Sequence, residues 1–549
     1  MTTSPNVLMV FPRFNHNSFW SLQAVCDIYG TRCPAPPLGM MTLAALLPPE
    51  WNIKLVNRNA EELEPADLEW ADVIMTGGML PQREDTLTVI GLARVYGKPV
   101  AVGGPDPMSA PEHYAEADFR VLGEAEGIIH EFIAAWNAGE RKGTFEGKRF
   151  QVDVAKSPIP RFDLINFEHY LYVGVQFSRG CPFNCEFCDI IELYGRVPRS
   201  KTNEQMLAEL QTLYDAGYRG HVDFVDDNLI GNKKALKRFL PALIEWQKAR
   251  KYPFEFSTEA SMNLADDSAL LGLLKEANFF AIFTGIESPD TETLIATQKK
   301  QNTRRSLADS VHKIYEAGMF VIAGFIVGFD TEKGSVATGM IDCIEDTAIP
   351  VSMVGLLTAL PNTQLTRRLE TEKRLLEFKS GGDQCSSGLN FKTLRPRSHI
   401  LRDYKTVLES IYQPAAYFER VRHVGLALKR PDHPSIFDLK TALHDTSFLA
   451  RLAWRMSVTM PELRREFWKT MTTVGRKNPA AVEYAIILMC FYLHMGPFAQ
   501  KVIADLELQI AEAELIERDA PVDHDVEVVR MGHLAVPKLS AASAMHPAA

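Results

Sequence analysis

Three cysteines within eight residues, Cys181, Cys185 and Cys188, are the part of the sequence best suited to chemistry. Thiolates are the soft ligands that iron–sulfur clusters select, and three on one loop can hold three irons of a 4Fe–4S cluster. With no fourth cysteine or histidine in the same loop, one iron stays open to an exogenous ligand. A structural zinc site normally closes with four protein ligands, and His169 and His221 could complete one, so zinc is the alternative.

Composition limits the class of protein. Eight cysteines in 549 residues are too few for a disulfide scaffold, and Met1–Pro12 has no cationic segment leading into an apolar one, so we expect a cytoplasmic protein with reduced thiols. The net charge of −10 argues against a dedicated nucleic-acid binder. The longest apolar runs, Met319–Phe329 and Tyr484–Leu493, are shorter than the roughly 20 residues of a membrane-spanning helix, so we expect them to be a buried strand or helix.

The first third of the chain alternates short apolar runs with helical patterns, which predicts a parallel, doubly wound sheet. The expected strands are Val7–Phe11, Ile53–Val56, Val73–Met75, Val100–Val102 and Phe119–Leu122, and the expected helices are Met40–Leu47, Gln82–Tyr96 and Glu124–Trp136. No G-x-G-x-x-G follows the first strand, so the pattern is not that of a dinucleotide-binding fold.

Small residues follow three of these strands, as Gly77-Gly78, Gly103-Gly104 and Gly123-Glu124. Glycine lets the backbone approach a ligand closely, and ligands of open parallel sheets sit outside the carboxyl ends of the strands. We expect a ligand cleft along this edge. The alternative is that the glycines only make tight turns.

The central third predicts a partial β/α barrel, whose functional groups sit at the carboxyl ends of its strands. A β-like run, Tyr172–Phe177, leads into the cysteine loop, and further strands are expected at Val222–Val225, Phe254–Ser257, Ala281–Thr284, Phe320–Ile326 and Val354–Leu357. Polar or small groups at the strand ends are Asp226-Asp227-Asn228, Glu259, Gly285 to Ser288 and Gly324 to Gly328. Placement at a strand end favours function for Glu259 and Glu287. For Asp226 and Asp227, function and a helix cap or surface charge stay equally open.

The C-x-x-x-C-x-x-C arrangement, with Phe187 before the last cysteine, resembles the radical S-adenosylmethionine (SAM) superfamily. The resemblance implies that the three cysteines hold a 4Fe–4S cluster and that SAM chelates its open iron. It also implies a set of cofactor-binding residues: Phe187 and Ile326, flanked by Gly324 and Gly328, near the adenine, Glu287 and Ser288 near the ribose or methionine, and Asn228, Glu259 and Gly285 at the strand ends. The usual G-x-I-x-G-x-x-E ends here on Thr331, with Glu332 one residue late.

The sheet that precedes the barrel makes the chain resemble the cobalamin-binding branch of this superfamily. The D-x-H-x-x-G signature of many cobalamin proteins is missing after Ile53–Val56, where the chain reads Asn57 to Glu62 without a histidine. The resemblance implies that Gly77, Gly78 and Met79 approach the lower face of the corrin and that Gly103, Gly104 and Glu124 line its tail or rim. An empty, structural sheet is the alternative.

The last third is predicted to be helical, with helices at Tyr404–Ile411, Ser447–Met456, Pro461–Thr470 and Pro479–Leu493. Its overall arrangement and the residues Leu389-Asn390-Phe391 resemble a C-terminal extension found on a subset of cobalamin-type radical SAM proteins. That subset includes hopanoid methylases. Residues 415–480 carry 12 Lys/Arg against 6 Asp/Glu, with aromatics interleaved, so peripheral membrane contact is one expectation and a bundle that buries its aromatics is the plainer one. The predicted domain limits are 1–145 for the N-terminal sheet, 146–375 for the barrel and 376–520 for the helical part. A disordered tail is expected over 521–549.

Together, the resemblance implies an α/β enzyme with a Rossmann-like cobalamin-binding domain, a radical SAM barrel and a helical domain. It implies methylation of an unactivated carbon through a 5′-deoxyadenosyl radical and methylcobalamin, with an external electron donor such as flavodoxin or ferredoxin and no nucleic acid. A polycyclic lipid, a tetrapyrrole or a peptide would each fit as the substrate, and the similarity to hopanoid methylases points toward a lipid-like small molecule. Alternatives are cyclisation or rearrangement without methyl transfer, and a zinc-holding, non-enzymatic adaptor. A tRNA methylthiotransferase is disfavoured, because Cys26 and Cys33 alone precede the barrel and the chain ends in helices.

Overall fold

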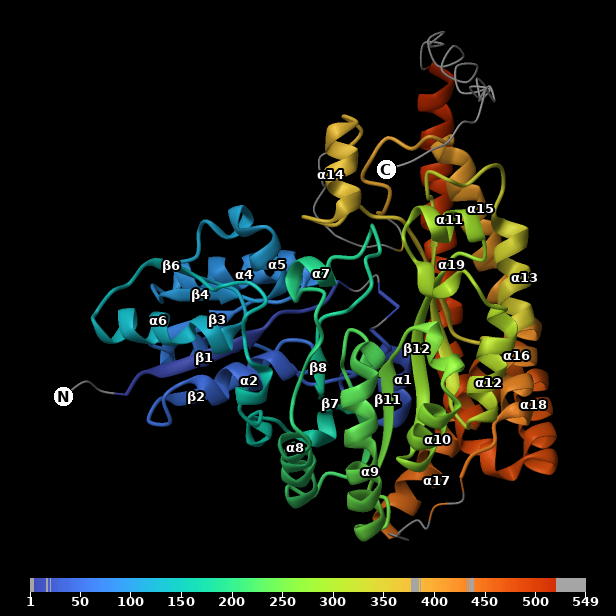
Figure 1. The fold of residues 1–549 in the computed structure, drawn as a ribbon, viewed down its shortest axis with the longest axis horizontal. Helices are drawn as coiled ribbons and strands as arrows, with labels where there is room; N and C mark the ends of the chain where they lie inside the picture. The colour runs from blue at the N-terminus through green and yellow to red at the C-terminus, as the bar shows by residue number, and fades with distance from the viewer. Residues whose placement is uncertain are drawn as a thin grey trace, which may run out of the picture.

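The computed structural model describes residues 4–15, 18–19, 21–376, 385, 387–431, 433 and 439–519. Two six-stranded parallel sheets lie beside each other, and a set of long helices covers the far side of the second sheet (Figure 1). The tail expected from residue 521 lies outside the described residues. The limits between the three predicted parts stay predictions.

The first sheet has the order β2-β1-β3-β4-β5-β6, with every neighbouring pair parallel. Its strands are β1 (Asn6–Phe11), β2 (Asn52–Asn57), β3 (Val73–Thr76), β4 (Val100–Gly103), β5 (Phe119–Leu122) and β6 (Gly143–Glu146). Its helices are α2 (Leu38–Leu46), α3 (Pro65–Trp70), α4 (Arg83–Val95), α5 (Pro105–Ser109) and α6 (Ala125–Asn137). Alternate residues of β1 enter different apolar clusters, Val7 and Met9 in one and Leu8 and Val10 in the other, so both faces of the sheet are buried.

The strand order of this sheet changes direction between β1 and β3, because β2 lies on the outer side of β1. In open α/β sheets such a switch point leaves a crevice beyond the carboxyl ends of the two strands, and ligands bind there. The loop after β3 contains Gly77 and Gly78, so the predicted glycine loops lie at this crevice.

The second sheet has the order β14-β13-β12-β11-β10-β7, again parallel throughout. Its strands are β7 (Val173–Val175), β10 (Gly220–Phe224), β11 (Phe254–Glu259), β12 (Phe279–Glu287), β13 (Phe320–Val327) and β14 (Ser352–Leu356). The connecting helices are α8 (Asn203–Asp215), α9 (Lys233–Ala249), α10 (Ser268–Glu276), α11 (Thr291–Ala296), α12 (Leu307–Glu316) and α13 (Ala337–Thr347). Between β7 and α8 the chain forms the ribbon β8 (Ser178–Arg179) and β9 (Arg199–Ser200), with the short helix α7 (Ile190–Leu193) in its loop.

Helices follow the second sheet: α14 (Gln364–Thr371), α15 (Arg397–Ile411), α16 (Pro414–Ala427), α17 (Leu439–Trp454), α18 (Arg464–Lys477) and α19 (Val482–Asp519). Helix α15 joins them to the sheet, since Tyr404 and Tyr412 donate hydrogen bonds to the carbonyls of Val354 and Ser352. Helix α19 is long and apolar enough to cross a membrane, yet 67% of its most apolar stretch is buried inside the protein. The buried helix expected at Tyr484–Leu493 is therefore confirmed, but it does not end at Leu493 as predicted and continues through Pro497 to Asp519.

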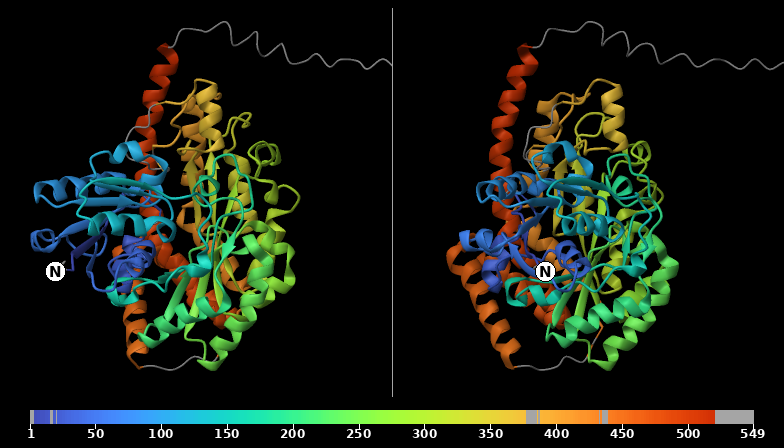
Figure 2. Two further views of the ribbon diagram at one scale, coloured as in Figure 1. Left: turned by 60° about the vertical axis from the view of Figure 1, so that its left-hand side comes forward. Right: turned by 90° about the vertical axis from the view of Figure 1, so that its left-hand side faces the viewer.

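The segment between β1 and α2 leaves the first sheet and packs against the helices. Its helix α1 (Gln23–Tyr29) lies beside α17 and α19, and the Phe19 and Phe498 rings are 4.9 Å apart. The two views of Figure 2 show this segment, in dark blue, next to the orange and red helices. The first sheet and the C-terminal helices are thus connected directly as well as through the barrel.

Candidate functional site

The cysteine loop begins where β8 ends and is held by backbone hydrogen bonds to distant parts of the barrel. The amide of Cys181 donates to the carbonyl of Gly195 over 3.2 Å, and that of Glu186 donates to Thr297 over 3.0 Å. The amide of Leu365 in turn donates to the Glu186 carbonyl over 2.9 Å. The loop is therefore fixed by β/α connections at the carboxyl end of the barrel, where the strands were expected to place it.

Polar side chains point at two of the three sulfurs. The side-chain amide of Asn228 lies 3.7 Å from Cys181 Sγ, and that of Gln301 lies 3.7 Å from Cys185 Sγ. Burial raises the pKa of the Cys181 and Cys188 thiols, and the charge of Lys299 acts in the opposite direction on both. Amide donors and a nearby cation stabilise thiolates, which is the form that binds iron. The donor set therefore fits an iron–sulfur cluster.

The arrangement does not fit a single zinc ion. Among the described residues, no three His, Cys, Asp or Glu side chains gather closely enough to hold one metal ion. His169 lies 3.2 Å from Glu61, and the His221 ring lies 2.6 Å from Ser257 Oγ, so neither is engaged with the cysteines. Ligands of a cluster surround several metals and stand farther apart than those of one zinc ion. The described residues therefore offer no closed site for a single zinc ion at the cysteine loop.

Asp226 and Asp227 hold the strand that leads into this loop. The Asp226 carboxylate accepts hydrogen bonds from the amides of Phe177 and Ser178 and from the Ser178 hydroxyl, and Asp227 accepts one from the Gly180 amide over 2.9 Å. Burial raises the pKa of Asp226 to about 7 and that of Asp227 to about 6. Neither is a helix cap or a surface charge. They position the cysteine loop from beneath, while the adjacent Asn228 reaches the sulfur.

A bulge at the end of β12 aims Glu287 at Lys299. The register with β13 shifts between Gly285 and Glu287, and Glu287 adopts a φ of 68°. Its carboxylate lies 2.6 Å from Lys299 Nζ, and a Cβ on Gly285 would stand 2.1 Å from Glu287 Oε1. A side chain at Gly285 would therefore displace this ion pair. Burial lowers the pKa of Lys299, but Glu287 and Cys185 outweigh it and the pKa rises, so Lys299 stays charged.

The displaced glutamate of the predicted glycine motif still organises its loop. Glu332 Oε1 accepts the amides of Gly328, over 2.8 Å, and Phe329, over 3.1 Å, and its other oxygen pairs with Arg395. Phe329 packs 5.8 Å from Phe187, ring centre to ring centre. These two rings line a smaller cavity of about 280 Å³ that also contacts Thr297. Ser288 is buried and accepts the Asp290 amide over 3.1 Å.

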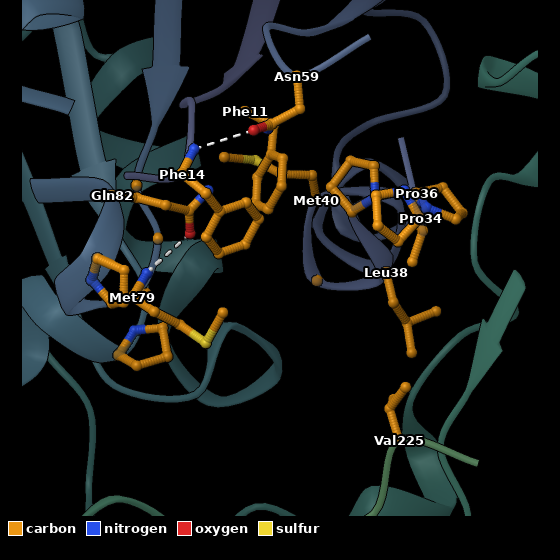
Figure 3. A pocket seen from close by; sticks show the side chains of 18 of the residues that line it. Phe11, Phe14, Pro34, Pro36, Leu38, Met40, Asn59, Met79, Gln82 and Val225 are labelled. Carbon is orange, nitrogen blue, oxygen red and sulfur yellow. Dashed lines mark hydrogen bonds between the residues drawn. The ribbon is translucent and has the colours of Figure 1, made fainter. Parts of the chain in front are cut away.

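The glycine loops of the first sheet pack tightly against each other. Gly77 has a φ of 146°, and a Cβ there would stand 1.7 Å from the Gly103 carbonyl oxygen. Met79, which is 46% exposed, projects from this loop, and its amide donates to Gln82 Oε1 over 3.1 Å (Figure 3). The edge therefore presents glycine backbone and one flexible apolar side chain, which suits contact with a large, flat ligand.

A cavity of about 1540 Å³ connects this edge with the mouth of the barrel. Figure 3 shows Phe11, Phe14 and Met79 on one side of it and Leu38 and Val225 on another. The predicted site residues that line it are Gly77, Gly78, Met79, Gly103, Gly104, Glu124, Glu259, Gly285, Glu287, Gly324 and Ile326. Residues predicted from two separate sheets thus meet in one space. Phe187 lines the smaller cavity instead.

Glu124 lines the cavity, but cations engage its carboxylate. Arg179 Nη1 lies 3.1 Å from Glu124 Oε1, and Arg199 Nη1 lies 2.7 Å from Oε2. Arg179 also binds Glu126, whose pKa falls to about 2 because this ion pair outweighs the effect of burial. The cluster joins the first sheet to the ribbon that carries the cysteine loop. It fixes one wall of the cavity relative to the other.

Two acidic side chains of the barrel, Asp223 and Glu259, face the same cavity. Burial, together with the nearby carboxylate of Asp223, raises the pKa of Glu259 to about 8. Burial raises that of Asp223 to about 6, and Asp223 accepts a hydrogen bond from Ser257. His221, on the other side of Ser257, stays neutral because burial lowers its pKa to about 3. The lumen thus offers protonatable groups to a bound molecule.

Sequence reasoning missed Lys299 and Gln301. Both belong to the polar run that precedes α12, as does Arg304, which is exposed and therefore a solvated charge. Asn302, from the same run, donates to the Gly285 carbonyl over 3.0 Å. Lys300 is exposed whereas Lys299 is nearly buried, so residue type alone could not indicate which of the two lysines faces the site.

Two family models match the chain: the radical SAM superfamily over residues 175–337 and a domain of unknown function (DUF4070) over residues 363–507. An uncharacterised methyltransferase of Synechocystis is 42% identical over 92% of this chain and 94% of that protein. The hopanoid C-2 methylase of Rhodopseudomonas palustris is 34% identical over 91% of this chain and 94% of its own length.

Solved structures of cobalamin-dependent radical SAM enzymes share the fold. OxsB, solved with aqua-cobalamin bound, is 15% identical with a TM-score of 0.58, over 96% of this chain and 83% of that one. TsrM from Kitasatospora setae is a methyltransferase solved with cobalamin and a [4Fe-4S] cluster. It is 16% identical with a TM-score of 0.55, over 67% of this chain and 78% of that one. Its cysteine loop and these relatives show that the chain belongs to the radical SAM superfamily, in the family of methyltransferases that includes the hopanoid C-2 methylase.

Proposed function

We propose that this protein is a cobalamin-dependent radical SAM enzyme that methylates an unactivated carbon of a small, apolar molecule in the cytoplasm. The observation that carries the proposal is the single cavity that joins the glycine loops of the first sheet to the strand ends of the barrel. Removal of hydrogen with the help of one cofactor and methyl donation by the other need both cofactors beside one substrate, and a shared cavity allows it. As a radical SAM enzyme the protein uses a 4Fe–4S cluster and SAM.

Each cofactor has a group of residues that fits it. Cys181, Cys185 and Cys188 would hold the cluster, with Asn228 and Gln301 donating to two of the sulfurs. The cobalamin would lie on the Gly77–Met79 loop and the Gly103–Gly104 loop, and the described cavity lining contains no histidine as a lower ligand. When bound, the cluster and SAM supply a radical that removes hydrogen from carbon, and methylated cobalamin supplies the methyl group.

The residues of the chain orient these groups and keep water out. Glu287 and Lys299 would place the amino acid or ribose part of SAM, and Phe187 and Ile326, with Gly324 and Gly328, would contact the adenine. Apolar side chains from both sheets, including Phe11 and Leu38 from the first and Val225, after β10, from the second, enclose the space in which the substrate would lie. Exclusion of water protects radical chemistry from side reactions.

A polycyclic lipid is the substrate class that we propose. The hopanoid C-2 methylase acts on such a molecule by its name, and it aligns with nearly the whole chain. The largely apolar lining of the cavity suits an apolar body. The reductant would be a small electron carrier such as flavodoxin or ferredoxin, since reduction of the cluster must come from outside the chain.

The test uses the protein reconstituted anaerobically with iron, sulfide and hydroxocobalamin, then supplied with SAM labelled in its methyl group, a reductant and a lipid extract. We expect label in a lipid product and formation of 5′-deoxyadenosine, both lost in Cys185→Ala and retained in Cys343→Ala, a half-buried cysteine of α13. Deoxyadenosine with an altered but unlabelled product would instead indicate cyclisation or rearrangement and contradict the methylation proposal.

A further inference from the structure

Two tryptophans of the C-terminal helices are exposed, contrary to the plainer expectation that this region buries its aromatics. Trp454 is 65% exposed and Trp468 is 48% exposed, while their neighbour Phe467 is fully buried. Leu443 and Val458 are also exposed, by 64% and 49%. Single exposed apolar residues are ordinary, but large ones grouped on one face indicate an interaction site.

The group forms one continuous face. Leu443, Ala450 and Trp454 are spaced by seven and four residues along α17, so they share one side of that helix, and all three are exposed. Val458 follows in the turn Arg455–Thr459. From α18, Trp468 Nε1 donates to Ser457 Oγ over 3.0 Å, which fixes the indole ring over this turn.

Arginines surround these apolar side chains. Arg455, Arg464 and Arg465 are exposed, and none of the three pairs with a carboxylate among the described residues. Arg464 Nε donates to the Ser457 carbonyl over 2.7 Å, beside the indole of Trp468. Other cations nearby do have acidic partners, since Arg422 binds Glu466 and Lys469 lies 3.7 Å from Glu419. Unpaired arginines therefore lie beside the exposed aromatics, with Glu462 the exposed carboxylate in the same connecting segment.

We propose that this basic-aromatic face, formed by Leu443, Ala450, Trp454, Arg455, Val458, Arg464, Arg465 and Trp468, binds the surface of an anionic lipid bilayer. Tryptophan has an apolar body and a polar N–H and therefore prefers the membrane interface, and unpaired arginines attract anionic headgroups. A second copy of the chain is a poorer occupant, because a two-fold contact would set these arginines against each other.

The face also lies close to the cavity. Arg451 of α17 donates to the Ile28 carbonyl of α1 over 2.7 Å, and the Phe448 and Tyr29 rings pack 5.4 Å apart. Helix α1 begins at Gln23, which lines the cavity. One short helix therefore separates the proposed membrane face from the cavity wall, at the end of the molecule away from α14 (Figure 1). This placement would let an apolar molecule pass from a bilayer toward the cavity.

The experiment is sedimentation of the full-length protein with vesicles of phosphatidylcholine alone or mixed with phosphatidylglycerol. We expect binding to the mixed vesicles that weakens at high salt. The double variant Trp454→Ala/Trp468→Ala should bind about tenfold more weakly, and the triple variant Arg455→Gln/Arg464→Gln/Arg465→Gln about a hundredfold more weakly. Quenching of tryptophan emission by brominated lipid should occur in the wild type and fall in the tryptophan variant.

Matched controls lie elsewhere on the surface. Leu515→Ala/Ile516→Ala removes two exposed apolar side chains of α19, and Lys148→Gln/Arg149→Gln removes two exposed charges; both should bind like the wild type. An unchanged thermal unfolding midpoint shows that each variant is folded. The proposal is wrong if the wild type does not bind the mixed vesicles or if the face variants bind as tightly as the controls. Self-association that the tryptophan variant abolishes, without vesicle binding, would also overturn it.

Discussion

Four buried charges around the cysteine loop have a defined partner, and that partner determines what the charge can do. Asp226 and Asp227 accept backbone amides and therefore position the loop, whereas Glu287 and Lys299 pair with each other at the cavity edge. The cysteines could be recognised from spacing alone. Lys299 could not, because its burial depends on the bulge at Gly285, which is a property of the folded barrel.

Lys299 provides the first prediction. Its charge acts on the thiols of Cys185 and Cys188, so it should also stabilise the reduced, more negative state of a cluster bound there. Replacing Lys299 with Met should shift the reduction potential of the cluster to a more negative value, measured by redox titration with electron paramagnetic resonance. Lys300→Met, an exposed neighbour, is the control. Equal potentials in wild type and Lys299→Met would contradict this role.

Glu259 predicts a pH dependence of stability. Its pKa is raised from 4.5 to about 8, so the folded state holds the proton more tightly than the unfolded chain does. The stabilisation is therefore complete below about pH 4.5 and is lost as the pH rises through 8. As the pH rises from about 5 to about 8, the free energy of unfolding of Glu259→Gln should gain about 3.5 kcal/mol relative to that of wild type.

Urea unfolding at the two pH values measures this gain, with Glu276→Gln, an exposed glutamate of α10, as the matched control. A difference between Glu259→Gln and wild type that is the same at both pH values would show that Glu259 does not titrate in this range.

At the scale of elements, apolar runs closed by glycine or proline predicted the buried strands well. Val7–Phe11 and Phe119–Leu122 lie within or match β1 and β5. Strand β6 was missed, since alternate residues of Gly143–Glu146 are exposed at the sheet edge and no apolar run marks it. Helix α19 was cut short at Leu493, because packing against α15 and α16 maintains the helix where the sequence becomes polar.

The glycine loop after β3 carries the prediction for this scale. Gly77→Ala places a Cβ against the Gly103 carbonyl at a φ of 146°, which forces the two loops apart. We expect a loss of about 3 kcal/mol or more in the free energy of unfolding and loss of cobalamin, with iron content retained. In α4 of the same sheet, Gly91→Ala meets no atom within 4 Å and should leave both unchanged. Retention of cobalamin by Gly77→Ala would show that this loop does not hold the corrin.

At the scale of the molecule, the cavity exists because two parallel sheets face each other with their functional edges. The ion pairs of Arg179 and Arg199 with Glu124 fix the sheets to each other near the cysteine loop, and the segment around Phe19 ties the first sheet to α19. The sequence predicted both edges separately. Which side-chain contacts hold the two edges together could not be read from it, because these contacts join residues more than 50 positions apart.

The most direct test of the central claim is the metal and corrin content of the full-length protein after anaerobic reconstitution with iron, sulfide and hydroxocobalamin. The account predicts about four irons and one cobalt per chain, with the visible bands of a cluster and of a corrin in the same protein. Cys185→Ala should lose the iron and keep the cobalt. Zinc in place of iron, or cobalt lost together with the iron, would contradict a cavity that holds two cofactors on two separate sets of residues.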